Sequence, residues 1–482
     1  MKPLCVKLFL VCWCFVLPAT AQTLNDDLPL RTSDFLGTSS DDAVVALAYG
    51  TNGDLWVAAN LGGTLPGMQA EALFGGGDGD LLHLDGRNLQ IKGWYSLPGH
   101  LSDGAARNDR LVVVGGGGVF MLGISGQGAA PIWDEQTNGF QRADISGDGL
   151  VVALNGTRVT AYDLQGASIS SRDFAQFTHI ADVAVDATRL YFTGFNQVSA
   201  NLKTPILTAY QRDSFGALEW LSYSFSERLL TEHGLGADTE GERVVIGDDG
   251  MLYFGAATDG GTTALKRDPK LISTPLPSGN GLSNILLESD RWSQTFQLSG
   301  AAKFSFFGRF DPANGNILKG GFILARLSNG NHNTLRIGNL VADREGNLLI
   351  SGRSFADIEG RAERTVAEQP VGAYAGGDMV LLVMAANLRD RLHWTPFNGT
   401  NPVGSSGSAV AVRGSFTSLA ARWAVAGTWN DPGPGAAIIH EGTQGDPNGG
   451  NEIYVAHNGR DLADLLALWP EVSVLDLTPY YD

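Results

Sequence analysis

The chain has 482 residues and a formal net charge of −18 at pH 7, from 33 lysines and arginines against 51 aspartates and glutamates. This acidity disfavours binding to nucleic acid phosphates or to an anionic membrane surface, so neither is an expected partner. The 63 glycines exceed the usual share of soluble proteins and alternate with short apolar runs, a pattern typical of many short strands joined by tight turns.

The first 21 residues have the pattern of a secretory signal peptide. Lys2 and Lys7 precede an apolar run over 8–17, and the small residues of 19–21 then supply a cleavage site. The apolar run is too short to span a bilayer, and no later segment is apolar enough to do so. We therefore expect the mature chain, residues 22–482, to be secreted or periplasmic and to have no membrane span.

The three cysteines, Cys5, Cys12 and Cys14, all lie within the predicted signal peptide. The mature chain would then have no disulfides, no thiolate nucleophile and no cysteine metal ligands. Its stability must come from a hydrophobic core, which a chain of this length can supply.

One unit recurs along the mature chain: an apolar run, a turn rich in Gly, Asp and Asn, and a second apolar run. This pattern is typical of a β-hairpin. The seven copies have their paired runs at 45–49 and 55–58, 104–106 and 111–115, 143–145 and 150–153, 183–186 and 190–194, 244–246 and 251–255, 340–343 and 348–352, and 409–412 and 423–427.

A second pair of runs follows several of these copies, as at 80–84 and 89–94 or at 379–383 and 392–394. Four strands per unit, repeated about seven times, predict an all-β fold with a single β-propeller of seven four-stranded blades. Six blades is the alternative, because the seventh copy is the weakest. Trp94, Trp133, Trp220 and Trp394 recur late in the units, where we expect them to fill the wide outer part of the blades.

The sequence resembles the secreted bacterial seven-bladed β-propeller repeats of the SBBP type. The likeness is clearest in DREGNLLISG at 343–352 and in GGDMVLL at 376–382. The resemblance implies an exported scaffold, and it carries no catalytic motif that could be transferred to this chain.

Long segments fall at 60–79, 257–320, 353–377 and 428–450, which in a propeller open on one face. Function gathers on elaborated loops of a rigid scaffold, so we expect the binding site on that face. The insertions near 257–320 and 353–377 supply candidate ligand-binding residues. These candidates are Trp292, Phe307, Arg309, Arg353 and Asp357. The alternative interpretation is that the aromatic residues form the core of a small inserted hairpin and that the charged ones are solvated.

No catalytic residue is indicated. The eight histidines are scattered without zinc-binding spacing, and a Gly-x-Ser-x-Gly nucleophile motif is absent. No cofactor is expected, and which metal the chain binds, if any, is not indicated. The acidic turns at 75–80 and 446–452 offer oxygen ligands that would suit a structural calcium ion, although ordinary turns have the same composition.

Ring closure has two candidate strands, the C-terminal run at 472–477 and the mature N-terminus around 28–35. Either would cover an exposed sheet edge.

The functional hypotheses are two. The first is an exported, monomeric, non-enzymatic scaffold that binds a glycan, a peptide or a cell-surface component through its long-loop face. The second is a propeller hydrolase or lyase with carboxylates near the central axis. Clustered, partly buried acids and arginines at the axis would favour the enzyme, and an apolar axial mouth would favour binding.

Overall fold

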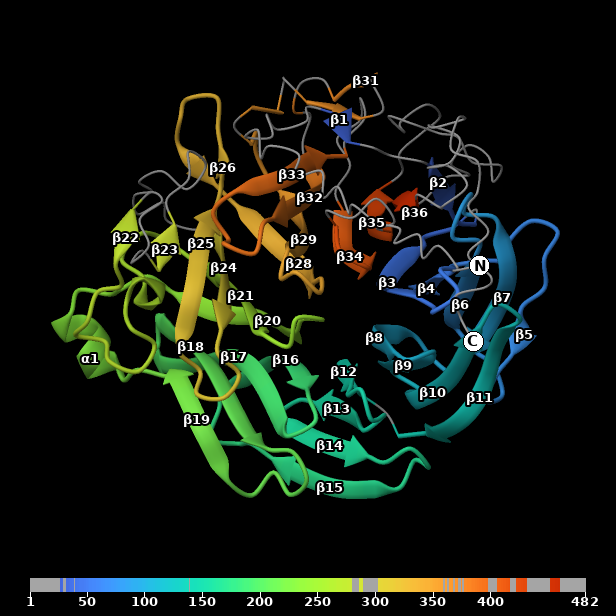
Figure 1. Cartoon of the computed structure of the whole chain (residues 1–482), viewed down its shortest axis with the longest axis horizontal. Helices are drawn as coiled ribbons and strands as arrows, with labels where there is room; N and C mark the ends of the chain where they lie inside the picture. Colours follow the sequence, from blue (N-terminus) through green and yellow to red (C-terminus); the bar gives the residue numbers. More distant parts are fainter. Residues whose placement is uncertain are drawn as a thin grey trace, which may run out of the picture.

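The computed structural model shows a ring of β-sheets arranged around one axis, with one strand of each sheet nearest the centre (Figure 1). The residues that the structure describes are 27–28, 32–38, 40–137, 139–279, 286–288, 302–358, 360–361, 364–366, 369–371, 374, 377–397, 405–416, 422–430 and 451–459.

The first four blades follow one another along the chain, each from its inner to its outer strand. Blade 1 consists of β3 (Ala43–Tyr49), β4 (Leu55–Asn60), β6 (Gly79–Leu84) and β7 (Ile91–Leu97). Blade 2 consists of β8 (Leu101–Arg107), β9 (Arg110–Gly115), β10 (Gly118–Ser125) and β11 (Gly128–Glu135). Blade 3 consists of β12 (Arg142–Ile145), β13 (Val151–Asn155), β14 (Arg158–Tyr162) and β15 (Ser168–Asp173). Blade 4 consists of β16 (His179–Val185), β17 (Arg189–Ser199), β18 (Leu202–Gln211) and β19 (Leu218–Tyr223).

The remaining three blades complete the ring. Blade 5 consists of β20 (Thr239–Ile246), β21 (Leu252–Thr258), β24 (Phe304–Phe310) and β25 (Ile317–Ile323). Blade 6 consists of β28 (Leu335–Ala342), β29 (Leu348–Ser354), β32 (Asp378–Met384) and β33 (Arg391–Pro396). Blade 7 consists of β34 (Ser405–Arg413), β35 (Arg422–Asn430), β36 (Asn451–Gly459) and β2 (Thr32–Leu36).

Short elements decorate the connections and the blade edges. The helices are α1 (Glu227–Glu232) and the 3-10 turn η1 (Ala264–Lys266). The short strands are β1 (Asp27–Leu28), β5 (Glu71–Ala72), β22 (Ser278–Gly279), β23 (Leu287–Glu288), β26 (Ala325–Arg326), β27 (His332–Asn333), β30 (Thr365–Val366) and β31 (Gln369–Pro370).

This arrangement confirms the predicted all-β propeller with seven four-stranded blades. Blade 5 differs from the sequence-based interpretation. Its third and fourth strands are β24 and β25, so the phenylalanines of 304–310 belong to the blade itself. The insertion between the second and third strands of this blade is therefore confined to residues 259–303.

The recurrent tryptophans pack between blades, as predicted. Trp94, Trp133, Trp220 and Trp394 each lie in the fourth strand of a blade and are at most 8% exposed. The perimeter of a ring is wider than its centre, so outer strands need bulky side chains to reach the next blade.

The ring is closed by the N-terminal strand. β2 pairs antiparallel with β36 and becomes the outer strand of blade 7, with Phe35 opposite Tyr454. The Phe35 ring lies 5.4 Å from that of Trp429 and 5.2 Å from that of Tyr454. Of the two predicted closures, the structure shows the N-terminal one, and residues 472–477 lie outside the described part of the chain.

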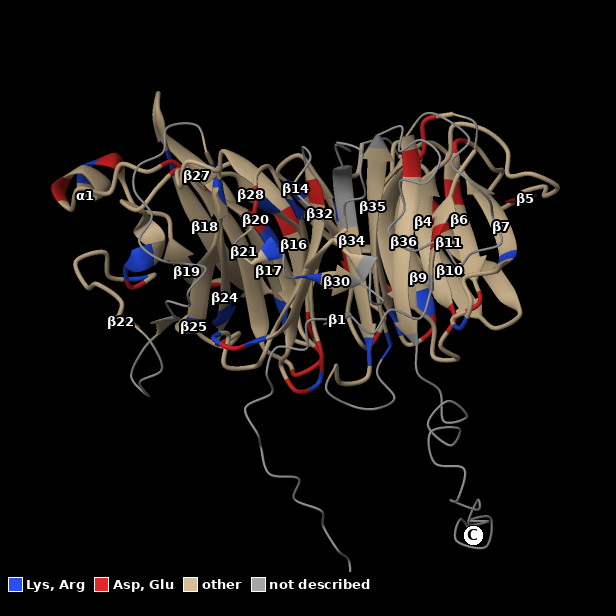
Figure 2. Ribbon diagram, turned by 90° about the horizontal axis from the view of Figure 1, so that it is seen from above, with Lys and Arg blue, Asp and Glu red and all other residues tan. Residues whose placement is uncertain are grey.

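The two faces of the ring differ in their connections. The links between blades and between second and third strands share one face, where α1, β5 and β27 lie along the upper rim of Figure 2. The turns after the inner strands lie on the other face and are short. Charged residues are concentrated at the rims, and most of the strand surface is uncharged (Figure 2). Within the described residues, no helix is long and apolar enough to cross a membrane.

Replacing Phe35 by alanine should weaken the closure of the ring. A buried phenylalanine that loses its ring costs about 3–5 kcal/mol of stability, so we expect a clear fall in the midpoint of thermal unfolding. Ile132→Ala is the matched control, because Ile132 is 45% exposed on the outer strand of blade 2. Equal midpoints for the two variants would show that β2 does not hold the ring closed.

Candidate axial binding site

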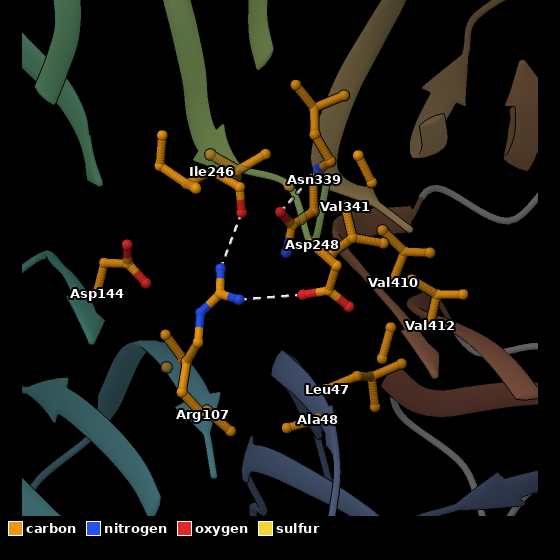
Figure 3. Close-up of a pocket in the computed structure, with 18 of the residues that line it drawn as sticks. Leu47, Ala48, Arg107, Asp144, Ile246, Asp248, Asn339, Val341, Val410 and Val412 are labelled. Atoms are coloured by element: carbon orange, nitrogen blue, oxygen red, sulfur yellow. Dashed lines mark hydrogen bonds and ion pairs between the residues drawn. The ribbon is translucent and has the colours of Figure 1, made fainter. Parts of the chain in front are cut away.

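The inner strands enclose a cavity on the axis of the ring. It has a volume of about 570 Å³, and all seven inner strands contribute to its lining (Figure 3). The lining runs from the middle of these strands to the turns that follow them, at Thr51, Asp109, Gly250 and Arg344. The cavity therefore reaches the short-turn face. No described residue of the four long loops lines it, so it lies away from the face that loop length predicts to be functional.

Four charged side chains of alternating sign occupy one level of this cavity. They are Asp103 on β8, Arg142 on β12, Asp182 on β16 and Arg243 on β20, on four consecutive blades. In β8, β16 and β20 the charged residue directly follows a register irregularity of the inner strand. Such bulges change the direction in which a side chain points, which places these residues on the axis.

The two arginines satisfy backbone carbonyls that the bulges leave outside the strand ladders. Arg142 donates through Nε to the Ala181 carbonyl at 3.2 Å and through Nη1 to the Ser102 carbonyl at 3.3 Å. Arg243 donates through Nε to the Gly338 carbonyl at 2.6 Å and through Nη1 to the Glu242 carbonyl at 2.9 Å. A carbonyl without a partner in a half-buried site is costly, so both side chains have a structural role.

The aspartates accept hydrogen bonds from the backbone of the next blade. Oδ2 of Asp103 accepts from the Ala143 amide at 3.0 Å, and Oδ2 of Asp182 accepts from the Val244 amide at 3.0 Å. Asp144 lies two residues after Arg142 on β12, and its Oδ2 accepts a hydrogen bond from the Val185 amide at 2.8 Å. Each of the three carboxylates thus joins two inner strands through one oxygen.

Burial changes the acid–base behaviour of this group. It raises the pKa of Asp144 and of Asp182 to about 6 and also raises the pKa of Asp103, because each carboxylate loses water on the axis. Burial likewise lowers the pKa of the Arg243 guanidinium. Two acids of the cavity therefore change charge within the range of mildly acidic solutions.

An ion pair crosses the axis near the short-turn face. Arg107 of blade 2 donates through Nη1 to Oδ1 of Asp248 at 3.0 Å and through Nη2 to the Ile246 carbonyl at 2.8 Å. The acceptors belong to blade 5, on the other side of the cavity (Figure 3). Both side chains are about one-third exposed. The pair therefore crosses the cavity opening in contact with water and contributes little to stability.

A second charged group lies at the opposite end of β20. Glu240 accepts a hydrogen bond from Nζ of Lys203 at 3.1 Å, and Glu242 accepts one from Nη1 of Arg336 at 3.3 Å. Burial raises the pKa of Glu242 to about 7. Neither glutamate lines the axial cavity, although the charges of Glu242 and Arg243 act on each other.

The predicted site residues do not converge in the structure. Trp292 lies outside the described residues. Phe307 is 3% exposed inside the core between blades 5 and 6. Arg309 lies at the short-turn end of β24, where its Nη2 is 3.7 Å from Oδ2 of Asp249. Arg353 and Asp357 lie at the other end of blade 6, where the Arg353 guanidinium stacks on Phe355.

The two acidic turns considered for calcium give no assembled site among the described residues, where no three acidic or histidine side chains are arranged to hold a metal ion. Asp80 of the first turn is 5% exposed and accepts from Trp94 Nε1 at 2.7 Å and from the Leu61 amide at 2.8 Å. Most of the second turn lies outside the described residues. A calcium site thus stays a prediction.

The sequence does carry a signal for the axial group. Each of the four charged residues directly precedes the apolar or small-residue run of an inner strand, as Asp103 precedes Gly104 and Arg243 precedes Val244. A charge at this position in four consecutive repeats is unusual for a buried strand. Such a series could have indicated residues that face the axis.

No family model matches the chain, and a search of curated proteins finds no match. The resemblance to SBBP-type repeats thus stays a prediction. Similar solved structures include YCF48 bound to D1 peptide (10% identity, 90% of this chain and 98% of that chain, TM-score 0.41) and Sqt1 of Saccharomyces cerevisiae (10%, 88% and 99%, 0.39). Hsv2p of Kluyveromyces lactis is similar at 9% identity over 80% and 92% of the two chains, with a TM-score of 0.38. These likenesses are too remote to indicate a ligand, and the fold rests on the strand pairings.

The pKa of Asp144 predicts a pH-dependent stability. A carboxyl near 6 in the folded chain and near 4 when unfolded stabilises the fold while it is protonated. That contribution is fully present below about pH 4 and is lost as the pH rises through about 6. Asp144→Asn keeps an acceptor for Val185 without the buried charge. We expect it to raise stability at pH 7 by up to about 3 kcal/mol and to have no effect at pH 4.

Thermal unfolding between pH 4 and pH 8 measures this difference. Asp134→Asn, which removes an exposed carboxylate on the outer strand of blade 2, should leave the midpoint unchanged at every pH. A lower midpoint for Asp144→Asn at pH 7 would contradict the expected sign.

Proposed function

We propose that this protein is an exported, non-enzymatic binding scaffold that holds a small ligand, or a side chain of a larger one, in its axial cavity. The observation that supports this most directly is the cavity itself. About 570 Å³ is within the range of small-molecule sites, and the lining combines apolar side chains such as Leu47 and Val410 with a larger polar part that is rich in Asp and Arg. A glycan, a peptide or a cell-surface component remains the wider class of partner.

The alternative is a hydrolase or lyase that uses the axial carboxylates. It is favoured by the clustered, partly buried acids and arginines on the axis, which is the arrangement expected from the sequence for an enzyme. It is also favoured by the raised pKa of Asp144 and Asp182, since acids that titrate near neutrality suit proton transfer. Against it stands the use of these groups as links between blades. An oxygen of each aspartate and two nitrogens of each arginine are bound to backbone atoms, which restricts their movement toward a substrate.

A plugged cavity separates axial binding from binding at the long-loop face. Val341 of β28 is half-buried and lines the cavity, so Val341→Trp should fill part of it. We expect ligands that the mature chain binds on glycan and peptide arrays, with and without calcium, to be lost in this variant. The thermal unfolding midpoint shows whether the variant is folded.

Phe355→Ala is the matched control on the other face, where Phe355 is 38% exposed beside Arg353. Loss of array binding in this variant, with binding retained by Val341→Trp, would move the site to the long-loop face. Release of a product from any bound ligand would favour the enzyme instead.

Export follows from the proposed signal peptide. When the full chain is expressed with its own leader in a Gram-negative bacterium, we expect the protein in the periplasm or the medium, beginning at Gln22. N-terminal sequencing tests this, and an intact Met1 on cytoplasmic protein would contradict it.

A further inference from the structure

The two halves of the axial cavity differ in chemistry. Blades 1, 6 and 7 contribute apolar side chains, among them Leu47, Val341, Val410 and Val412. Blades 2 to 5 contribute most of the charged side chains, and blades 6 and 7 add Arg344 and Arg413. Figure 3 shows the Asp144 carboxylate on the opposite side of the cavity from these apolar residues. A ligand that matches both halves must be polar at one end and apolar along the other.

The cations on the charged side already have partners. Arg142 and Arg243 are bound to backbone carbonyls of their own and neighbouring blades. Arg107 is bound to Asp248 and to the Ile246 carbonyl. These contacts fix the three guanidinium groups against protein acceptors, through Nε and Nη1 in Arg142 and Arg243 and through Nη1 and Nη2 in Arg107. Arg344 lies exposed in the turn after β28, where its charge is screened by water. Arg413 is the last residue of β34 and is half-buried, and burial lowers the pKa of its guanidinium.

Asp144 differs from the arginines. Its Oδ2 accepts from the Val185 amide, and no salt bridge with it exists among the described residues. Three aspartates and two arginines, counting Asp103, Asp144, Asp182, Arg142 and Arg243, make up the inner part of the charged side. This inner part has one more acid than arginines, although the whole lining has as many arginines as aspartates. Burial raises the pKa of Asp144, and the charge of Arg107, which is bound to Asp248, only partly offsets that effect.

We propose that the axial cavity binds an organic cation with an apolar portion, such as an alkylammonium ion or the side chain of a lysine. The ammonium group would donate to the Asp144 carboxylate, and the carbon chain would lie along Leu47, Val341 and Val410. The ammonium offers three donors and the positive charge that the carboxylate lacks. The inference rests on the proposed function and adds the chemical class of the ligand.

Three probes of equal length and different charge test the inference: 1-hexylamine, 1-hexanol and hexanoate, titrated into the purified mature chain by calorimetry at pH 7.5. We expect hexylamine to bind roughly tenfold or more tightly than the other two, as is usual for a charge-assisted hydrogen bond in a partly buried site. Across butyl-, hexyl- and octylamine, each added CH₂ that is buried should strengthen binding by roughly fourfold. Equal binding of the three hexyl probes would overturn the inference.

Substitutions in the charged and the apolar half of the cavity test which part of the ligand each half binds. Asp144→Asn should remove the preference for hexylamine over hexanol. Val341→Thr, which keeps the shape of the wall and adds a hydroxyl, should weaken all amines and flatten their dependence on chain length. Asp134→Asn, far from the axis, should bind hexylamine as the unaltered chain does. Hexylamine binding that survives Asp144→Asn at full strength would overturn the assignment.

The source of the cation is tested by a short neutral peptide with one lysine, compared with the same peptide carrying norleucine. Tighter binding of the lysine peptide than of hexylamine indicates a protein partner, and the reverse order indicates a free amine. Failure of the inference differs from failure of the proposed function. If Val341→Trp loses the array ligands but no amine binds to the unaltered chain, the proposed axial binding stands and the inference of a cationic ligand fails.

Discussion

Each blade of this protein is apolar on both faces, and neither face can be left in contact with water. β21 and β32 are buried along their whole length, and β4 and β9 are buried along nearly all of theirs. A four-stranded sheet of this kind is stable only between two similar sheets. The ring is the closed form of that requirement, and its closure through β2 supplies the last outer strand.

The same ring geometry leaves polar backbone groups without strand partners at the centre. Inner strands converge on the axis, where the sheets have no further strand to cover their edges. Bulges in β8, β16, β20 and β28 leave carbonyls outside the ladders, and Arg142 and Arg243 donate to these carbonyls. The aspartates in turn accept the amides of the next blade. The charges that line the cavity thus first hold the inner strands together, and among the described residues Asp103 and Asp144 do so without a salt bridge, whereas Asp182 lies 3.8 Å from Nε of Arg142.

The sequence was sufficient for the architecture because each blade repeats a strong local signal. A turn that contains Gly, Asn or Asp between two apolar runs marks the first hairpin of each blade, and tryptophans mark the fourth strands of four blades. Blade 5 was misread because 45 residues separate β21 from β24, so the phenylalanines of β24 were assigned to an insertion. The order of the strands along the chain does not indicate how many residues separate the second strand of a blade from its third.

The candidate site was harder to predict for a different physical reason. The direction of a side chain in a strand follows a period of two, and one bulge reverses it. A reader of the sequence places Asp103 or Arg243 on the wrong side of the strand unless the bulge is known. Loop length favoured the other face, where Arg353 and Asp357 lie, whereas Phe307 proved to be part of the core.

The pairing of β2 with β36 also determines when the fold can be completed. The partners lie at opposite ends of the chain, with Phe35 opposite Tyr454, so this contact has a very large sequence separation. Contacts of that kind form late because a long loop must be ordered first. Until β36 has been synthesised, β2 has no partner strand and its edge stays open to other chains. Six blades can stack as the chain emerges, but the circle is completed only by joining its beginning to its end.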